Sequence, residues 1–334
     1  MKRTILILIL VASLFLLGSC VNDSAESTTV DTTVSEPLSP TFSVDFPAEK
    51  QQYCAPWAGN VIQEAILDGK IHYYFMSGKG LIADPEGDDP QKWGDSTLIV
   101  FPNGQTMLVD SGVNTYNPIL VENLKRMGVT RLDYLMISHP HGDHCWGLIL
   151  KDNFLDHIQV DQVLWNGASF GVSKRVLSNC ASRGVPMQVV KRGDTIVFGD
   201  VTMRVLWPLE GVEGIDPGET EDENNTSIVA RFDYKEHSSL FVGDIYVSGE
   251  ERIVDLCGNE LDVDLLKVPH HGYNTSSSSL FAYKVRPDLA VAMGAYRAPV
   301  ENRYKSIGSD FLSDRLHGYI HVSSDGNEMI VEHE

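Results

Sequence analysis

Residues 138–147 read SHPHGDHCWG, and this segment constrains the fold more than any other part of the sequence. Four potential metal ligands lie within six positions, namely His139, His141, Asp143 and His144. The largely apolar run before them, residues 132–137, predicts a buried strand that presents these side chains at its C-terminal end. In a chain with 11 histidines among 334 residues, a chance match to this pattern has odds on the order of one in a thousand. The pattern therefore predicts a metal site rather than a solvated, histidine-rich turn.

The spacing within the segment predicts two metal ions rather than one. His139 and His141 alternate where the strand ends, so both can turn toward a first cation. Asp143 and His144 follow one turn later, at a predicted helix start, and can reach a second cation nearby. Imidazole and carboxylate together suit zinc, manganese or iron. We expect two divalent metal ions, zinc or manganese.

Further ligands are expected at the ends of two other apolar strands. The run FVGDI ends at Asp244, and a carboxylate in this place can bridge two metal ions. The run LLKVPHHG ends at His270 and His271. One of these imidazoles can complete the second metal site, and the other can face the substrate.

The order of the remaining segments predicts a mixed α and β fold. Strand pairs come first, strand–helix alternation follows, and the mixture repeats in the second half. Two mixed sheets with helices outside would bury these strands on both faces. Hairpins are expected at 194–208, 226–245 and 319–333, helices at 118–128, 147–155, 170–184, 248–258, 277–285 and 309–318, and a loop at 295–310.

Five segments, taken in order, resemble the metallo-β-lactamase superfamily: TMLVDSG, SHPHGDH, NNTSIVARFDY, FVGDI and KVPHHGYNTS. Within that superfamily they are similar to the branch that contains the soluble domain of the DNA-uptake competence protein ComEC. The resemblance extends from about residue 70 to the C-terminus. It implies a four-layer αβ/βα sandwich, in which two mixed β-sheets carry helices on their outer faces and a dinuclear metal site lies between the sheets.

The resemblance also implies a ligand for each position. His139 and His141 would hold the first ion, and Asp244 would bridge both ions. The second ion would be held by Asp143, His144 and His271. Asp110, in LVDSG, would orient a ligand loop or imidazole by hydrogen bonding, although it could also be an ordinary turn aspartate.

This chain departs from many hydrolases of the superfamily because it lacks a further histidine for the first ion. His157 follows the motif too closely, and His237 is expected in a solvated turn. The ComEC-like branch has an asparagine in this place, which by position is Asn225, with Asn224 adjacent. An amide oxygen is a weak neutral ligand and favours a harder ion such as manganese. An Asx turn before a strand is the alternative role for Asn225.

The expected reaction is metal-assisted hydrolysis. Two divalent cations that share a hydroxide create a nucleophile at neutral pH and neutralise charge on the attacked centre. Asp143 is expected to be essential to catalysis, and His270 to act as an acid or hydrogen-bond donor to the substrate. Thr275 and Ser276 could bind a phosphate oxygen, but a helix cap is the favoured role for the run NTSSSS, residues 274–279.

The missing histidine favours a phosphodiester over a lactam, lactone or thioester. A small-molecule or cell-envelope phosphodiester is expected, because a net charge of −20 without basic runs disfavours nucleic acid. Basic residues at 297–305 could bind an anion or belong to a solvated loop, which is the preferred interpretation. A phosphorylcholine-esterase-like enzyme and a metal-binding module without catalysis remain alternatives. The sequence leaves the oligomeric state open.

The N-terminal part predicts an exported bacterial lipoprotein. Residues 1–19 read as a signal peptide, with a basic start and a short apolar run. The segment LGSC that ends at Cys20 resembles a bacterial lipobox, which implies cleavage before Cys20 and lipidation of that residue. Residues 20–50 are rich in Ser, Thr and Pro and predict a flexible tether, so the hydrolase domain would comprise residues 51–334. Anchoring through the lipid alone is expected, in the periplasm or at the cell surface. The disulfide pairing of four further cysteines stays open, namely Cys54, Cys145, Cys180 and Cys257.

Overall fold

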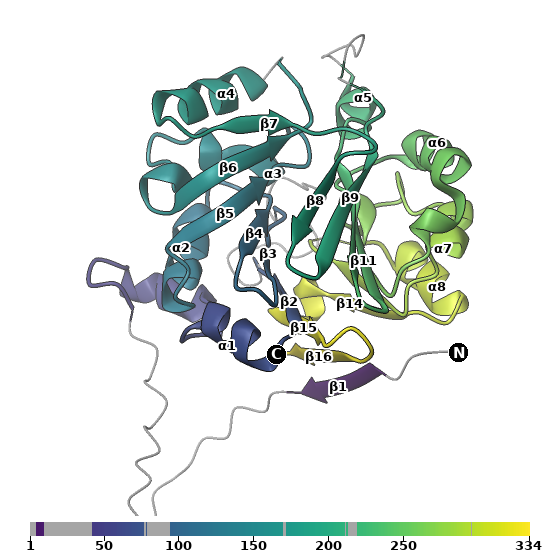
Figure 1. Ribbon diagram of the computed structural model, residues 1–334, viewed down its shortest axis with the longest axis horizontal. Coiled ribbons are helices and arrows are strands. Elements are labelled where there is room, and N and C mark those ends of the chain that lie inside the picture. Colours follow the sequence, from purple (N-terminus) through teal and green to yellow (C-terminus); the bar gives the residue numbers. More distant parts are fainter. Residues whose placement is uncertain are drawn as a thin grey trace, which may run out of the picture.

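Two mixed β-sheets face each other, and helices cover the outer side of each sheet (Figure 1). The computed structural model describes residues 5–9, 42–76, 78, 94–169, 172–210, 212, 219–294 and 296–334. The expected lipidation site at Cys20 and most of the expected tether lie outside these residues. The expected four-layer αβ/βα sandwich is confirmed.

The first sheet has nine strands in the order β1-β16-β15-β2-β3-β4-β5-β6-β7. Its middle strands are antiparallel hairpins, whereas β4, β5, β6 and β7 run parallel. The strands are β1 (Ile5–Ile9), β2 (Ile71–Phe75), β3 (Thr97–Val100), β4 (Thr106–Val109), β5 (Arg131–Met136), β6 (Gln159–Trp165), β7 (Met187–Val189), β15 (Ile320–Ser324) and β16 (Met329–His333).

The second sheet has seven strands in the order β14-β13-β12-β11-β10-β9-β8. Strands β8 to β11 are antiparallel, and β11 to β14 run parallel. The strands are β8 (Thr195–Phe198), β9 (Val201–Trp207), β10 (Val229–Tyr234), β11 (His237–Phe241), β12 (Leu265–Lys267), β13 (Leu289–Ala292) and β14 (Asp310–Ser313).

Helices pack on the two outer faces (Figure 1). The first sheet carries α1 (Val61–Asp68), α2 (Asn117–Arg126) and α4 (Ser173–Ser182), and the second carries α6 (Val247–Cys257), α7 (Ser279–Val285) and α8 (Ala298–Ser306). Local signals bound α1: Gln63 N–H donates to the Asn60 side chain at its start, and Gly69 ends it with φ of 63°.

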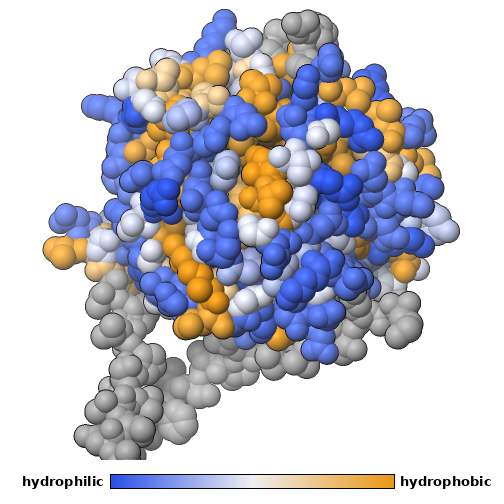
Figure 2. Space-filling view, viewed as in Figure 1, coloured by the Kyte–Doolittle hydropathy of each residue, from blue (hydrophilic) through white to orange (hydrophobic). Residues whose placement is uncertain are grey.

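Three apolar layers separate the four layers of secondary structure. The middle layer lies between the sheets, where Phe101 of the first sheet stacks on Phe198 of the second at 4.0 Å. The other two layers lie between each sheet and its helices. The face seen in Figure 2 is mostly hydrophilic, with hydrophobic residues in small separate groups. Among the described residues, no helix is long and apolar enough to cross a bilayer.

Three sequence-based assignments were wrong. Residues 147–155 form short 3₁₀ turns instead of a helix, because Asn153 caps the second turn and donates its side-chain N–H to Leu148 O at 2.8 Å. Residues 310–313 form β14, which completes the parallel ladder beside β13, and only α9 (Asp314–His317) is helical. The expected loop at 295–310 contains α8, which has a proline in its first turn and a Glu301–Lys305 ion pair at 2.6 Å.

Residues near the N-terminus contact the domain in two places. Strand β1 lies within the expected signal peptide and pairs parallel with β16. Residues 42–50, assigned to the tether, pack on α2: Ser43 donates its N–H and hydroxyl to Glu122 at 2.7 and 2.6 Å, and Arg126 lies 4.5 Å from the centre of the Phe42 ring. Chain packing therefore begins before residue 51. Cleavage and lipidation stay predictions.

A row of polar side chains in contact with one another lies on the outer side of the first sheet. His72 Nδ1 lies 3.0 Å from His321 Nε2, and His72 Nε2 lies 3.2 Å from Asp68 Oδ1. Burial, with His321 adding to it, lowers the pKa of His72 from 6.5 to about 4. Between these pH values the unfolded chain therefore binds more protons at His72 than the folded chain does.

This pKa difference predicts that stability falls as the pH drops from 6.5 to 4. The loss at His72 amounts to on the order of 3 kcal/mol and is absent above this window. His72→Gln should flatten this part of the pH dependence, as measured by the Tm at each pH. The matched control is His157→Gln, which changes an exposed histidine. Parallel curves for the parent and His72→Gln would contradict the assignment.

Candidate metal centre

The histidine motif lies where β5 ends and enters the short helix α3 (Gly142–Cys145). The chain turns tightly here, and a Cβ on Gly142 would overlap the Trp146 ring. Only glycine leaves room for this packing. The turn places Asp143 and His144 on the first helical residues, both buried, between the two sheets.

The facing half of the centre comes from the ends of β11 and β12. Asp244 follows β11, and its N–H donates to Ser227 Oγ at 2.9 Å. After β12, the 3₁₀ segment η6 (Pro269–Gly272) holds His270 and His271 at φ of 45° and 53°. Such left-handed conformations are unfavourable for residues other than glycine. The His270 N–H donates a hydrogen bond to Gly243 O at 3.2 Å. This bond connects the segment to the loop that carries Asp244 and helps to hold the strained backbone conformation.

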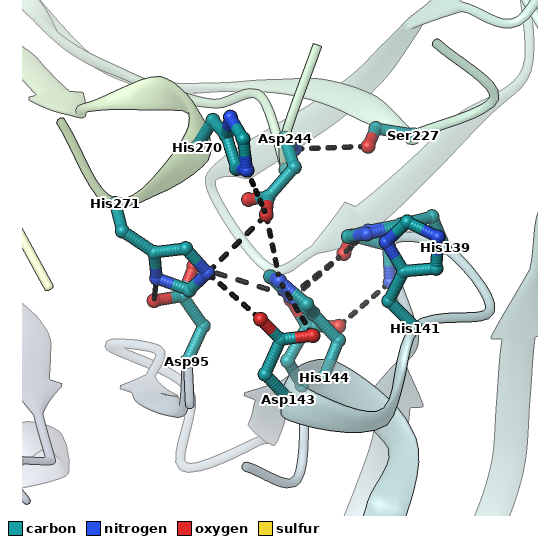
Figure 3. A network of polar contacts seen from close by, with 12 residues as sticks. Asp95, His139, His141, Asp143, His144, Ser227, Asp244, His270 and His271 are labelled. Atoms are coloured by element: carbon teal, nitrogen blue, oxygen red, sulfur yellow. Dashed lines mark hydrogen bonds and ion pairs between the residues drawn. The ribbon is translucent and has the colours of Figure 1, made fainter. Parts of the chain in front are cut away.

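Four buried side chains converge from the two halves (Figure 3). Asp244 Oδ2 lies 3.1 Å from His144 Nε2 and 3.2 Å from His271 Nε2. Asp143 Oδ2 lies 3.1 Å from His271 Nε2. These ligand atoms all lie within 4.8 Å of one another, which is close enough for one cation to contact all four residues.

Two carboxylates lie next to the Nδ1 atoms of His144 and His271 and orient these imidazoles. Asp110 Oδ2 lies 2.7 Å from His144 Nδ1, and its own position is fixed by Ser138, whose N–H and hydroxyl donate to it at 2.7 and 2.8 Å. Asp95 Oδ1 lies 3.2 Å from His271 Nδ1, which also lies 2.8 Å from Met293 O. In both histidines the Nε2 atom is thereby directed toward Asp244.

His139 and His141 lie beside this group, with ring centroids 4.7 Å apart. Within the described part of the chain, His139 Nε2 is buried without a hydrogen-bond partner. His141 Nε2 lies 2.7 Å from Glu223 Oε2, at the end of α5 (Thr220–Asn224). An unpartnered buried nitrogen is unfavourable, and a bound cation would remove this cost.

The contacts of Asn225 do not support its assignment as a metal ligand. Its Oδ1 accepts the N–H of Tyr246 at 3.0 Å, and its Nδ2 donates to Ser248 Oγ at 3.0 Å. The preceding residue, Asn224, is buried, and its Oδ1 has no hydrogen-bond partner among the described residues. The sequence could not separate these neighbours, because which amide points inward depends on how α5 ends.

Three residues at the centre were not predicted as site residues from the sequence, namely Asp95, Glu223 and Lys267. A lone aspartate before a strand and a glutamate in an acidic helix are common, so neither Asp95 nor Glu223 gave a signal. Lys267 did give one, because a lysine inside the apolar run LLKV requires a buried partner. Its Nζ contacts Asp95 Oδ2 and lies 3.7 Å from Asp244 Oδ1.

Other predicted residues lie around or away from the centre. His270 Nε2 lies 4.0 Å from Asp244 Oδ2, and His270 Nδ1 lies 2.5 Å from Thr275 Oγ1. Ser276 donates to Ile245 O at 2.6 Å, and Ser278 of the same run caps α7 by accepting the Phe281 N–H at 3.1 Å. His157 lies 2.6 Å from Asp152. The expectation of a solvated turn at His237 was wrong, because pairing with β10 places His237 at the buried start of β11. The four cysteines that the structure describes are free thiols.

The pKa directions follow the local charge. Burial alone would raise the pKa of Asp244, but His144 and His271 hold it well below its usual value. Burial acts against the imidazolium forms, yet the carboxylates, Asp244 foremost, raise the pKa of His144 and His271 well above the usual value. Burial lowers the pKa of His270 to about 4. The centre therefore combines anionic carboxylates with protonated imidazoles, and a divalent cation that binds there would displace the protons of His144 and His271.

Residues 94–295, more than half of the chain, match the metallo-β-lactamase superfamily. The chain belongs to this superfamily. Its curated relatives include ComE operon protein 3 of Bacillus subtilis, 28% identical over 188 residues that cover 56% of this chain and 22% of the relative. Another is competence protein ComA of Neisseria gonorrhoeae, 29% identical over 237 residues that cover 66% of this chain and 30% of the relative. The expected similarity to the ComEC branch is thus confirmed, over less than a third of the length of these relatives.

Among solved structures, the metallo-β-lactamase fold protein YhfI from Bacillus subtilis aligns with a TM-score of 0.47 and 13% identity. The alignment covers 73% of this chain and 95% of YhfI.

The bond between Asp110 and His144 predicts that Asp110→Asn weakens metal binding by roughly 10- to 100-fold, because the imidazole loses its carboxylate partner. The dissociation constant of Zn²⁺ or Mn²⁺ measures this effect. The control is Asp133→Asn, which alters a carboxylate that accepts the Thr106 N–H at 2.8 Å at the other end of β5. Equal affinity in the parent and Asp110→Asn would show that the bond does not position His144 for metal.

Proposed function

We propose that this chain is a metal-dependent phosphodiesterase that holds two divalent cations at the seam between its sheets. The observation that carries the proposal is the convergence of carboxylates and imidazoles from both sheets on one buried point, beside atoms that make no hydrogen bond to a described residue. His139 Nε2 and Asp244 Oδ1 are such atoms among the described residues. Buried groups of this kind are costly in a site without a ligand.

The residues fit two cations in adjacent positions. One would be held by His139, His141 and the amide oxygen of Asn224, which replaces Asn225 in this role. The other would be held by Asp143, His144 and His271, and Asp244 would contact both. Divalent cations in such a site activate water near neutral pH and offset negative charge on the attacked phosphorus.

The chain itself positions groups for substrate binding. Thr275 bonds His270 Nδ1, so His270 Nε2 faces the centre, where the neutral imidazole can donate a hydrogen bond to a substrate oxygen. Tyr246 stacks against the His270 ring at 4.8 Å and limits its rotation. The carboxylate of Glu223 contacts Nε2 of His141, and this contact would have to break before that nitrogen could bind a metal ion.

Two features favour a phosphodiester over a lactam, lactone or thioester. His157 pairs with Asp152, and His237 lies at the start of β11, the opposite end from Asp244, so neither supplies the further histidine that many hydrolases of the superfamily use. The curated relatives include proteins named competence protein ComA and ribonuclease Z. The net charge of −20 favours a small-molecule or cell-envelope phosphodiester over nucleic acid. A lipid anchor at Cys20 would hold the enzyme at a membrane surface.

The activity is tested with the full chain, loaded with Mn²⁺ or Zn²⁺, on the chromogenic diester bis(p-nitrophenyl) phosphate. We expect turnover by the parent, retention by Asp133→Asn and loss to the buffer rate in Asp143→Asn, which removes a carboxylate ligand. Single-stranded DNA and a β-lactam serve as comparison substrates. Bound metal with equal background rates in the parent and Asp143→Asn would refute the diesterase assignment.

The proposed role of His270 predicts a separate result. His270→Gln should lower kcat by about 10²-fold, because the imidazole hydrogen-bond donor to the substrate is lost. Its metal content should equal that of the parent, because His270 holds no ion in this scheme. Elemental analysis beside the rate measurement tests both statements. A loss of metal in His270→Gln would instead make His270 a ligand.

A further inference from the structure

Lys267 is the one lysine or arginine that is buried among the described residues, with 4% of its surface exposed. It ends β12, in the parallel part of the second sheet. Its ammonium group reaches across to Asp95, which precedes β3 of the first sheet. Lys267 therefore joins the two sheets at the base of the metal centre, where an uncompensated charge would be strongly unfavourable.

Three oxygen atoms lie around the ammonium group, two of them from carboxylates. Lys267 Nζ contacts Asp95 Oδ2 and lies 3.5 Å from Gly243 O and 3.7 Å from Asp244 Oδ1. That Asp244 oxygen makes no hydrogen bond with any described residue. A cavity of about 10 Å³, room for about one water-sized particle, is bordered by Lys267, Asp95 and Asp110.

The same carboxylates belong to a second group that could hold a metal ion. One ligand atom from each of Asp95, Asp110 and His144 lies within 4.8 Å of the others. His144 is shared with the main group, which contains Asp143, Asp244 and His271. The fold thus offers two overlapping places for cations. The ammonium group contacts Asp95, one of the two carboxylates that belong to the smaller group alone.

We propose that Lys267 is a covalently attached cation that occupies the smaller group and excludes an additional metal ion from it. The ammonium compensates Asp95, which remains free to orient His271. It also attracts Oδ1 of Asp244 and leaves Oδ2 directed at His144 and His271. The Lys267 side chain then limits the number of metal ions in the centre. This inference rests on the proposal that the main group binds divalent cations.

The test counts ions in the parent and in Lys267→Ala, which removes the charge and makes room. Each full-length chain is dialysed against Mn²⁺ with tetramethylammonium chloride as the salt, because that cation is too large for the cavity. Elemental analysis then gives the Mn²⁺ content of each chain. We expect one more ion per chain in Lys267→Ala than in the parent, and no gain in Asp95→Asn/Lys267→Ala, which lacks the carboxylate. Arg204→Ala, which removes an ion pair with Asp233 on the same sheet, should bind as the parent does.

A stability measurement keeps the proposal testable if Lys267→Ala folds poorly. Removing one partner of a buried pair should lower the Tm without metal by on the order of 10 °C. Mn²⁺ should raise the Tm of Lys267→Ala more than that of the parent, because the ion takes over the role of the ammonium.

Three results would overturn the proposal: equal ion counts in the parent and Lys267→Ala, a gain that persists without Asp95, or a variant that stays unfolded in Mn²⁺. A parent that binds no ion would instead count against the proposed function. The role of Lys267 is tested by the difference in Mn²⁺ content between the parent and Lys267→Ala.

Discussion

Four buried carboxylates at the seam between the sheets, Asp95, Asp110, Asp143 and Asp244, determine most of what surrounds them. Like charges this close repel each other strongly in a poorly hydrated interior. Imidazoles approach from both sheets, and Lys267 contributes the remaining fixed positive charge. The chain can maintain this arrangement because each carboxylate has a defined partner, and because cations can enter where protein partners are missing. Function and stability thus depend on the same charge balance.

The sandwich creates this seam by bringing strand ends together. In the first sheet, β5 delivers the histidine motif, and in the second, β11 and β12 deliver Asp244 and the paired histidines. The hydrophobic layer between the sheets holds the two edges at a fixed spacing, as the Phe101–Phe198 stack illustrates. Positive φ angles at His270 and His271 then aim the rings inward. The apolar core thus supplies the precision that the polar centre requires.

The sequence predicted features that depend on local patterns. Apolar runs ending in histidine or aspartate identified β5, β11 and β12, and motif order identified the superfamily. It did not predict features that arise from tertiary contact. Residues 310–313 read as helix, but pairing with β13 made them a strand. The choice between Asn224 and Asn225 depends on which amide faces inward at the end of α5. Asp95 and Glu223 became recognisable only through their distances to His271 and His141.

The metal-binding residues are far apart along the chain, which has a consequence for how the protein matures. His144 and Asp244 are separated by 100 positions, and Asp143 and His271 by 128. Contacts of such long range form late, because loop closure must come first. A nascent chain therefore displays the SHPHGDH motif without Asp244 and His271, and the assembled centre exists only after both sheets have docked. Under the proposed function, the metals available in the compartment where folding finishes would decide which ion fills the centre.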